Sequence, residues 1–353
     1  MYDSDQNTVK AALKESNATV FSESTINQIL ALSTRDNATV HFDKVGPDAN
    51  GNVTVASGAE VVLVTSSDTF TTTVKPPANA PVVIFQGRGG VVATINDAAA
   101  SIPSSSDHNV LQPNVGRVVV GTAGNDKITI DDARNTKIIL GTGDSSVRTG
   151  NGIDTVEAGL GNSSIVGGSG DYAVVKLSGN ASNYQVTAQN GHAIVTDMTT
   201  RKTTDISKIQ YVQLDNGNAL IFAKNSLEGQ ITTLYHSMFG RDPDAGGLNY
   251  WFDVAKAGAT LKQITNAFYA SSEYAPYISQ SSLDFIQGLY KNTFNRAGED
   301  AGVAYWLDQL NHGQTRADVI SSFATIAIQN ILHEAPQQEA QIVGSVSIIT
   351  GII

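Results

Sequence analysis

The sequence predicts a multidomain β + α protein, with an all-β N-terminal region, a parallel β-roll or β-solenoid, and then an all-α C-terminal domain. β-branched runs punctuated by Gly, Asn and Pro dominate from residue 37, glycine pairs recur every nine residues from Gly141, and the apolar spacing becomes helical after about Ala223. The chain has 353 residues, whereas single hydrophobic cores stop growing near about 250 residues, so we expect more than one domain.

The composition narrows the classes of partner and of chemistry. The formal net charge is -11, from 22 basic and 33 acidic residues, which argues against nucleic acid or an anionic lipid surface as a partner. The same acidic balance suits a hard cation such as calcium, which prefers carboxylate oxygens. The chain has no cysteine, so disulfide bonds, thiolate zinc sites and cysteine nucleophiles are excluded.

The first segment, residues 1–115, is predicted to be a β-rich region with a short helical start. Apolar residues between Thr8 and Leu32 have partly helical spacing. β-branched runs follow at 38–42, 53–55, 60–64, 81–85 and 90–95. The first residues lack a basic and an apolar stretch, so we expect no cleavable secretory signal, and no apolar run reaches the roughly 18 residues of a membrane span.

The second segment, residues 116–224, contains the glycine repeat and a closing β segment. The glycine pairs are Gly141 and Gly143, Gly150 and Gly152, Gly159 and Gly161, and Gly168 and Gly170. One aliphatic residue keeps the same step, at Val147, Val156, Ile165 and Val174. Each repeat consists of a glycine turn and a very short strand with one inward apolar side chain. Repeats of this kind wind into a flattened parallel β-roll. We therefore expect each turn to bury its aliphatic residue against its neighbours.

The third segment, residues 225–335, is predicted to be helical and contains one motif twice. The first copy includes Leu234-Tyr235, Phe239, Arg241, Tyr250-Trp251 and Phe268, and the second includes Leu289-Tyr290, Phe294, Arg296, Tyr305-Trp306 and Phe323. Equivalent residues lie 55 positions apart throughout. The constant spacing predicts one helix-loop-helix geometry in both copies, with the aromatic residues in equivalent contacts.

Two parts of the chain resemble known families. The units at 121–129 and 149–157 resemble the RTX (haemolysin-type calcium-binding) nonapeptide, in which Gly-Gly-x-Gly-x-Asp is followed by an aliphatic residue two places later. The helical repeat is similar to the DUF4214 family, through Leu234-Tyr235, the run 239–244, Gly247-Leu248 and Tyr250-Trp251. Together these resemblances imply a type I secreted surface protein, S-layer-like proteins included.

The RTX resemblance implies calcium as a cofactor. In that family the aspartate at the sixth position of each nonapeptide helps to ligate calcium between stacked turns. This sequence keeps that residue at Asp126 and Asp154, while Asp144 and Asp171 lie one place early and the Asp131-Asp132 pair could add carboxylates. No two adjacent turns on one side both keep the sixth-position aspartate. The alternative is a roll held by aliphatic stacking and glycine turns alone.

The sequence contains none of the motifs expected of RTX enzymes, so we expect no enzymatic activity. His333-Glu334 lacks the second histidine of a zinc protease, and no Gly-x-Ser-x-Gly elbow is present. In the loop 241–244 we expect Asp242 or Asp244 to cap a helix, the less favoured alternative being a metal ligand. The pairs Tyr250-Trp251 and Tyr305-Trp306 could stack on a sugar or belong to the core.

The fourth segment, residues 336–353, is an apolar, β-prone tail in the position where type I export signals lie. We expect Ile348, Ile349 and Ile352 to make an assembly or ligand contact, the alternative being a strand docked on its own domain.

These features together predict a self-assembling extracellular protein of the cell surface, an S-layer or filament subunit exported by a type I-like route, whose partner is itself. A surface adhesin that binds glycan or polysaccharide is the first alternative. A glycan-active β-solenoid enzyme, which needs two well-placed carboxylates, is the second.

Overall fold

The structure is a computed structural model that describes residues 2–16, 20–33, 39–99, 115–169, 172–334, 341–343, 346–349 and 352. The chain divides into two compact units. Unit 1 comprises Met1–Ser178, Ser182–Gln185 and Ile194–Gln210, and unit 2 comprises Gly179–Ala181, Val186–Ala193 and Tyr211–Ile353. The finer division into four segments ending at residues 115, 224, 335 and 353 stays a prediction.

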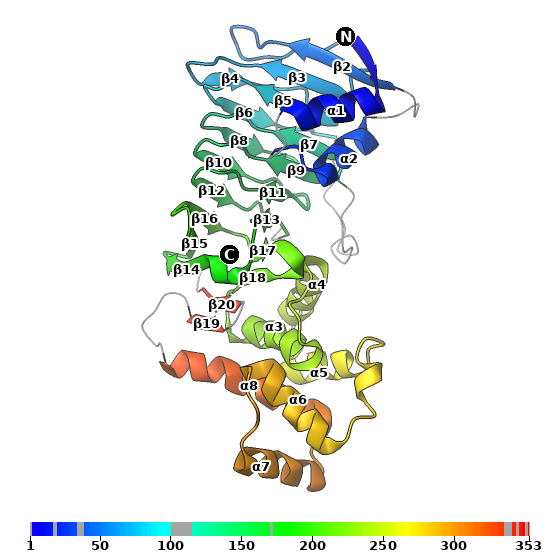
Figure 1. Cartoon of the computed structure of the whole chain (residues 1–353), viewed down its shortest axis with the longest axis vertical. Helices are drawn as coiled ribbons and strands as arrows, with labels where there is room; N and C mark the ends of the chain where they lie inside the picture. Colours follow the sequence, from blue (N-terminus) through cyan, green and yellow to red (C-terminus); the bar gives the residue numbers. More distant parts are fainter. Residues whose placement is uncertain are drawn as a thin grey trace. The chain divides into compact units, whose positions relative to one another are not determined.

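Unit 1 contains most of the strands (Figure 1). It begins with β1 (Tyr2–Asp5), α1 (Gln6–Ser16), α2 (Glu23–Leu32) and β2 (Thr39–Val45). The strands that follow are β3 (Val61–Thr65), β4 (Thr72–Val74), β5 (Val82–Gln86), β6 (Val91–Ile95), β7 (Arg117–Val120), β8 (Lys127–Ile130), β9 (Thr136–Ile139), β10 (Ser145–Arg148), β11 (Thr155–Glu157), β12 (Ser163–Val166), β13 (Val174–Lys176) and β16 (Thr203–Ser207). β14 (Tyr184–Gln189) and β15 (His192–Asp197) contribute residues to both units.

From β3 to β13, consecutive strands of unit 1 alternate between two sheets. The odd-numbered strands pair in parallel, each with the strand two places along, in what we call the first sheet. The strands β4, β6, β8, β10, β12 and β16 pair in parallel in the second sheet. β2 joins the first sheet in parallel with β3, and β1 closes its edge in the antiparallel direction. The predicted strand-rich N-terminal region with parallel sheets is thus confirmed.

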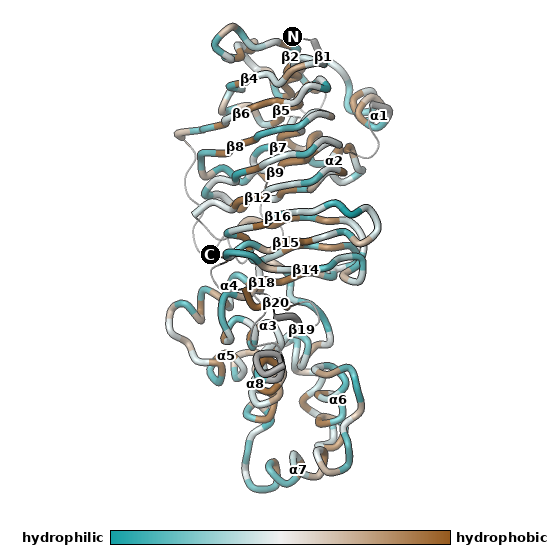
Figure 2. The backbone as a smooth tube through the Cα atoms, turned by 90° about the vertical axis from the view of Figure 1, so that its left-hand side faces the viewer, coloured by the Kyte–Doolittle hydropathy of each residue, from teal (hydrophilic) through white to brown (hydrophobic). Residues whose placement is uncertain are grey.

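Aliphatic side chains in register form a buried row along each sheet. The row of the second sheet is Val74, Ala93, Ile128, Val147, Ile165 and Ile206, all at most 2% exposed. In the first sheet, Val156 is in register with Val175 and not with the predicted Val174. Val175 is 0% exposed, so this one-residue shift keeps the buried row apolar. Figure 2 shows the resulting pattern, with hydrophobic stretches on strands and hydrophilic residues in the connecting turns.

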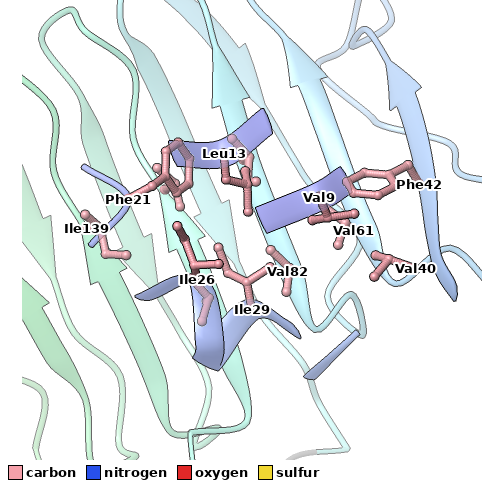
Figure 3. Close-up of a cluster of buried hydrophobic side chains, with 13 residues drawn as sticks. Val9, Leu13, Phe21, Ile26, Ile29, Val40, Phe42, Val61, Val82 and Ile139 are labelled. Carbon is pink, nitrogen blue, oxygen red and sulfur yellow. The ribbon is translucent and has the colours of Figure 1, made fainter. Parts of the chain in front are cut away.

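The helices α1 and α2 cover the face of the first sheet that is opposite the row of Val156 and Val175. Val9 and Leu13 of α1 and Ile26 and Ile29 of α2 pack on the strand side chains beneath them (Figure 3). These strand residues are Val40, Phe42, Val61, Val82, Ile84, Val118, Val120 and Ile139. Because strands covered on both faces need apolar residues at every position, this packing explains unbroken runs such as that of β5.

The turns of unit 1 explain why glycines recur every nine residues. A Cβ atom on Gly141 would lie 1.8 Å from the carbonyl oxygen of Thr122, and one on Gly159 would lie 1.8 Å from that of Gly141. A second stack links Asp132, Gly150 and Gly168 in the same way, with a Cβ on Gly168 only 1.7 Å from the Gly150 oxygen. Each of these glycines therefore makes room for the backbone of the neighbouring turn.

Unit 2 combines a group of strands with a helical bundle. Its strands are β17 (Tyr211–Gln213), β18 (Ala219–Ala223), β19 (Gln341–Val343) and β20 (Val346–Ile348), in the order β17-β18-β20-β19. Its α-helices are α3 (Ser226–Phe239), α4 (Ala245–Lys256), α5 (Leu261–Tyr269), α6 (Ser282–Phe294), α7 (Asp300–Asn311) and α8 (Arg316–Glu334). The predicted helical C-terminal region is confirmed. Within the described part of the chain, no helix is long and apolar enough to cross a membrane.

Candidate functional site

Asp126, the first of the predicted calcium ligands, lies just before β8 and is 3% exposed. Its carboxylate accepts hydrogen bonds from the backbone N–H of Thr122, at 2.8 Å, and from that of Val91 on the neighbouring strand, at 3.0 Å. The hydroxyl of Thr122 donates a third bond at 2.7 Å. The side chain of Asp126 therefore links the backbone of its own turn to the backbone of the adjacent strand β6.

Asp154 repeats this arrangement on the first sheet. Its side chain is completely buried and accepts from the backbone N–H of Gly150, four residues earlier, at 2.8 Å, and from that of Thr136 at 2.7 Å. The burial raises the pKa of Asp154 to about 7, against the opposing effect of these two N–H donors and of the Arg117 charge. The two sixth-position aspartates are thus equivalent hydrogen-bond acceptors, one in each sheet.

Asp144 belongs to a different hydrogen-bond arrangement, a ladder in which side chains of exposed turns accept backbone N–H groups. Asn125 accepts from the backbone N–H of Asp144 at 2.9 Å, Asp144 accepts from that of Asn162 at 2.8 Å, and Asn162 accepts from that of Thr203 at 3.1 Å. The bond from Asn162 holds the pKa of Asp144 below its usual range. Asp171 lies outside the described residues.

At Asp126 and Asp154 each carboxylate oxygen accepts at least one N–H or O–H group of the protein. These bonds use part of the lone pairs with which a carboxylate could bind calcium, and each carboxylate keeps others free. Among the described residues, no three His, Asp or Glu side chains gather into a group that could hold a metal ion. Calcium binding stays a prediction.

A buried ion pair that the sequence analysis did not find lies beside Asp154. Arg117 at the start of β7 is 0% exposed, and both its terminal nitrogens bond the carboxylate of Asp132 at 2.7–2.9 Å. Asp132 also accepts from the backbone N–H groups of Asp97, at 2.7 Å, and Arg134, at 3.0 Å. Arg117 Nε has no hydrogen-bond partner within the described part of the chain. The possible extra calcium ligand Asp132 is therefore the counter-ion of a buried arginine.

The pKa of Asp154 sets the sign of a pH effect on stability. Because its pKa of about 7 in the folded protein lies above the ordinary value of 3.8, the folded state binds more protons between these two pH values. We expect the free energy of unfolding of unit 1 to rise as the pH falls from 8 to 5. Burial also raises the pKa of Asp126, in the same direction.

Urea unfolding followed by far-UV circular dichroism from pH 8 to pH 5 measures this dependence. The variant Asp154→Asn does not titrate, so the slope of stability against pH should become smaller. An unchanged slope in this variant would contradict a raised pKa for Asp154.

The predicted contact residues of the tail lie buried inside unit 2. Ile348 is 8% exposed, and Ile349 and Ile352 are each 1% exposed. β20 pairs in parallel with β18, and the backbone N–H of Ile349 donates to the carbonyl oxygen of Ala223 at 2.8 Å. In this structure β20 is a strand docked on its own unit. A role of these residues in assembly stays a prediction.

The two helical motif copies build matching aromatic clusters. The ring centroids of Tyr235 and Phe268 lie 4.9 Å apart, and those of their equivalents Tyr290 and Phe323 lie 5.0 Å apart. An arginine lies over the tyrosine ring in each copy, Arg241 at 5.4 Å and Arg296 at 5.1 Å. The predicted equivalence of the aromatic contacts is confirmed.

The aromatic pairs divide between core and surface. Trp251 packs on Phe268 with centroids 4.8 Å apart, and Trp306 is 8% exposed. The preceding tyrosines, by contrast, are open to solvent, with Tyr250 42% exposed and Tyr305 54% exposed. Each copy therefore presents one exposed tyrosine at the same position of its second helix.

The acids of the loop 241–244 have structural roles. Asp244 is the N-cap of α4 and accepts from the backbone N–H of Gly247 at 2.7 Å, which confirms the predicted capping role. Asp242 instead accepts from the backbone N–H of Ala219 in β18 and pairs with His236, both at 2.9 Å. The second copy has Ala297 in the place of Asp242, so only the first copy can make this contact.

Comparison with known proteins identifies only the helical region. The family model described as "Domain of unknown function (DUF4214)" matches residues 223–278 and 268–327, which contain the two motif copies. The predicted DUF4214 resemblance is thus confirmed for this part of the chain. No curated protein and no solved structure matches the chain. The resemblance to RTX repeats and to S-layer proteins stays a prediction.

Proposed function

We propose that the protein is a non-enzymatic, self-assembling subunit of an extracellular layer or filament at the cell surface, exported by a type I-like route. In this proposal unit 1 is an RTX-like parallel β-roll that serves as a rigid scaffold. The observation that supports the scaffold role is the hydrogen bonding of three aspartates of unit 1. Asp126, Asp144 and Asp154 all accept backbone N–H groups from neighbouring turns or strands.

This use of acids suits a scaffold more than a reaction centre. A catalytic carboxylate must reach a substrate, whereas Asp126 and Asp154 are at most 3% exposed and have their oxygens engaged by the protein. Such bonds satisfy backbone donors that would otherwise be buried without partners. Repeated from turn to turn, they make unit 1 stiff, which is what a subunit under mechanical load in a surface layer requires.

Electron microscopy of the purified chain tests the proposal. We expect ordered filaments or lattices, and the same sample in excess chelator tests the separate prediction of bound calcium, whose removal would disperse them. Dispersed monomers both with calcium and with chelator would contradict self-assembly.

A glycan-binding adhesin is the second candidate, favoured by the exposed tyrosines Tyr250 and Tyr305. Their equivalent positions in the two copies would suit a polymer with repeated sugar units, since aromatic rings offer an apolar face with a polar tip. Saturable binding of a polysaccharide by a monomeric chain would support this candidate. Loss of binding in the double variant Tyr250→Ala/Tyr305→Ala, with unchanged binding in Tyr277→Ala, would assign it to these residues, because Tyr277 is comparably exposed, at 38%.

A further inference from the structure

The strand β18 is completed on one side by a segment that is far from it in the sequence. β17 pairs with β18 in the antiparallel direction on one edge, and β20 pairs in parallel on the other. The parallel pairing matches Ile221 with Val346, Phe222 with Ser347 and Ala223 with Ile348. The remaining edge of β18 is therefore an acceptor for one short strand.

The surroundings of this edge are shaped for the side chains of β20. Ile348 and Val346 form a buried cluster with Ala223 of β18 and Ile328 of α8. On α3, a Cβ atom at Gly229 would lie 3.2 Å from the Cδ1 atom of Ile348, so glycine leaves the space that this side chain needs. We call the site formed by β18, Gly229 of α3 and Ile328 of α8 the acceptor groove.

The acceptor groove cannot remain empty at low cost. Without β20, the backbone of β18, whose residues are all buried, would lose its strand partner on that edge, and the apolar surface around Ala223 would be uncovered. The segment that fits the groove is present in every copy of the chain. The same hydrogen bonds and packing can therefore form within one chain or between two chains, which is the condition for strand exchange.

We propose that, in the assembled protein, the acceptor groove of one chain holds β20 and the following Ile349 of a second copy. This inference rests on the proposed function, because it names the contact through which self-assembly occurs. Each chain then offers one groove and one donor strand, so exchange can continue from chain to chain in a head-to-tail manner. The donor contributes Val346 and Ile348, which cluster with Ala223 and Ile328 when the groove is filled by its own chain. It also contributes Ile349, whose backbone N–H donates to the carbonyl oxygen of Ala223.

A pair of cysteines placed across the groove distinguishes the two arrangements. The chain has no cysteine, so the variant Ala223→Cys/Ile348→Cys introduces a single possible disulfide between residues in register. After oxidation of a dilute monomeric sample, we expect a monomer band on a non-reducing gel. After oxidation of the assembled polymer, we expect a ladder of covalently joined chains. A monomer band alone from the polymer would overturn the inference.

Two further variants make the result independent of one substitution. Ile221→Cys/Val346→Cys joins the same two strands two register positions away and should give the same ladder. Val212→Cys/Leu220→Cys joins β17 to β18, which are adjacent in the chain, and should give a monomer band in every sample. A ladder from this control pair would mean that random collision produces the links, which would also overturn the inference.

The failure of this inference differs from the failure of the proposed function. Polymers without links between chains would contradict strand exchange and leave self-assembly standing. If no polymer forms, the proposed function is wrong. In that case the groove pairs can still form covalent dimers while the β17–β18 pair forms none, and this result would identify the groove as an exchange site. Monomers at every concentration would contradict strand exchange.

Discussion

Replacing Gly159 by alanine is expected to lower the free energy of unfolding of unit 1 by about 3 kcal/mol, the upper part of the usual range for overpacked sites. The added methyl group would lie 1.8 Å from the carbonyl oxygen of Gly141 and 3.0 Å from the carbonyl carbon of Leu140. Both neighbours are backbone atoms, so a side-chain rotation cannot relieve the clash. The turn must move away from the one beneath it, which also weakens the strand pairing that follows.

Urea unfolding with two probes measures this effect and localises it. Both tryptophans of the chain, Trp251 and Trp306, lie in unit 2, so their fluorescence follows that unit, whereas far-UV circular dichroism also reports the strands of unit 1. The strand transition should shift to lower urea while the fluorescence transition stays. Gly46→Ala is the matched control, because no atom lies within 4 Å of a Cβ at that position. Equal effects of the two substitutions would refute the stacking argument.

Replacing Arg117 by alanine is expected to cost about 3–5 kcal/mol, the range for breaking a buried ion pair by removal of one partner. The substitution leaves the carboxylate of Asp132, whose side chain is 1% exposed, without its counter-ion. In the unsubstituted protein the positive charge of Arg117 lowers the pKa of the nearby Asp154, against the effect of burial. The substitution removes this charge. The pKa of Asp154 should therefore rise further, and the pH dependence of stability should become steeper.

The double variant Arg117→Met/Asp132→Asn separates charge from packing. It removes both charges, while the side-chain amide that replaces the carboxylate keeps a carbonyl acceptor for one of the backbone donors of Asp97 and Arg134. Because no charge remains buried without a partner, the double variant should be more stable than Arg117→Ala in the same urea experiment. A double variant that is less stable than Arg117→Ala would show that side-chain packing, and not the unpaired carboxylate, determines the cost.

Local repetition made the architecture of unit 1 predictable in part. The nine-residue glycine step predicted stacked turns, and the structure explains it by contacts such as that between Gly141 and Gly159. The shift from Val174 to Val175 was not predictable, because the chain between β11 and β13 does not keep the step exactly. The cover of α1 and α2 over the first sheet also could not be derived, since helical spacing does not say which distant strands a helix will meet.

The candidate site was predicted at the level of positions and not of roles. Asp126 and Asp154 stand out by their place in the nonapeptide, but whether a carboxylate meets a cation or a backbone N–H depends on how closely the turns approach. Arg117 gave no signal, because a lone arginine before a valine run reads as the exposed end of a strand. Its pairing with Asp132 depends on the register of two turns, which no local pattern contains.

The ladder formed by Asn125, Asp144 and Asn162 limits how the length of this protein can change during evolution. Each member accepts a hydrogen bond from the next turn on the same side, and the stacked Gly141 and Gly159 are 18 residues apart. The loss of one codon within a turn would misalign the side chains that bond and stack with both neighbours. Duplication of an 18-residue block would instead add one strand to each sheet and keep the register of the turns on both sides of the insertion. Genes for such chains should therefore grow and shrink by whole pairs of turns.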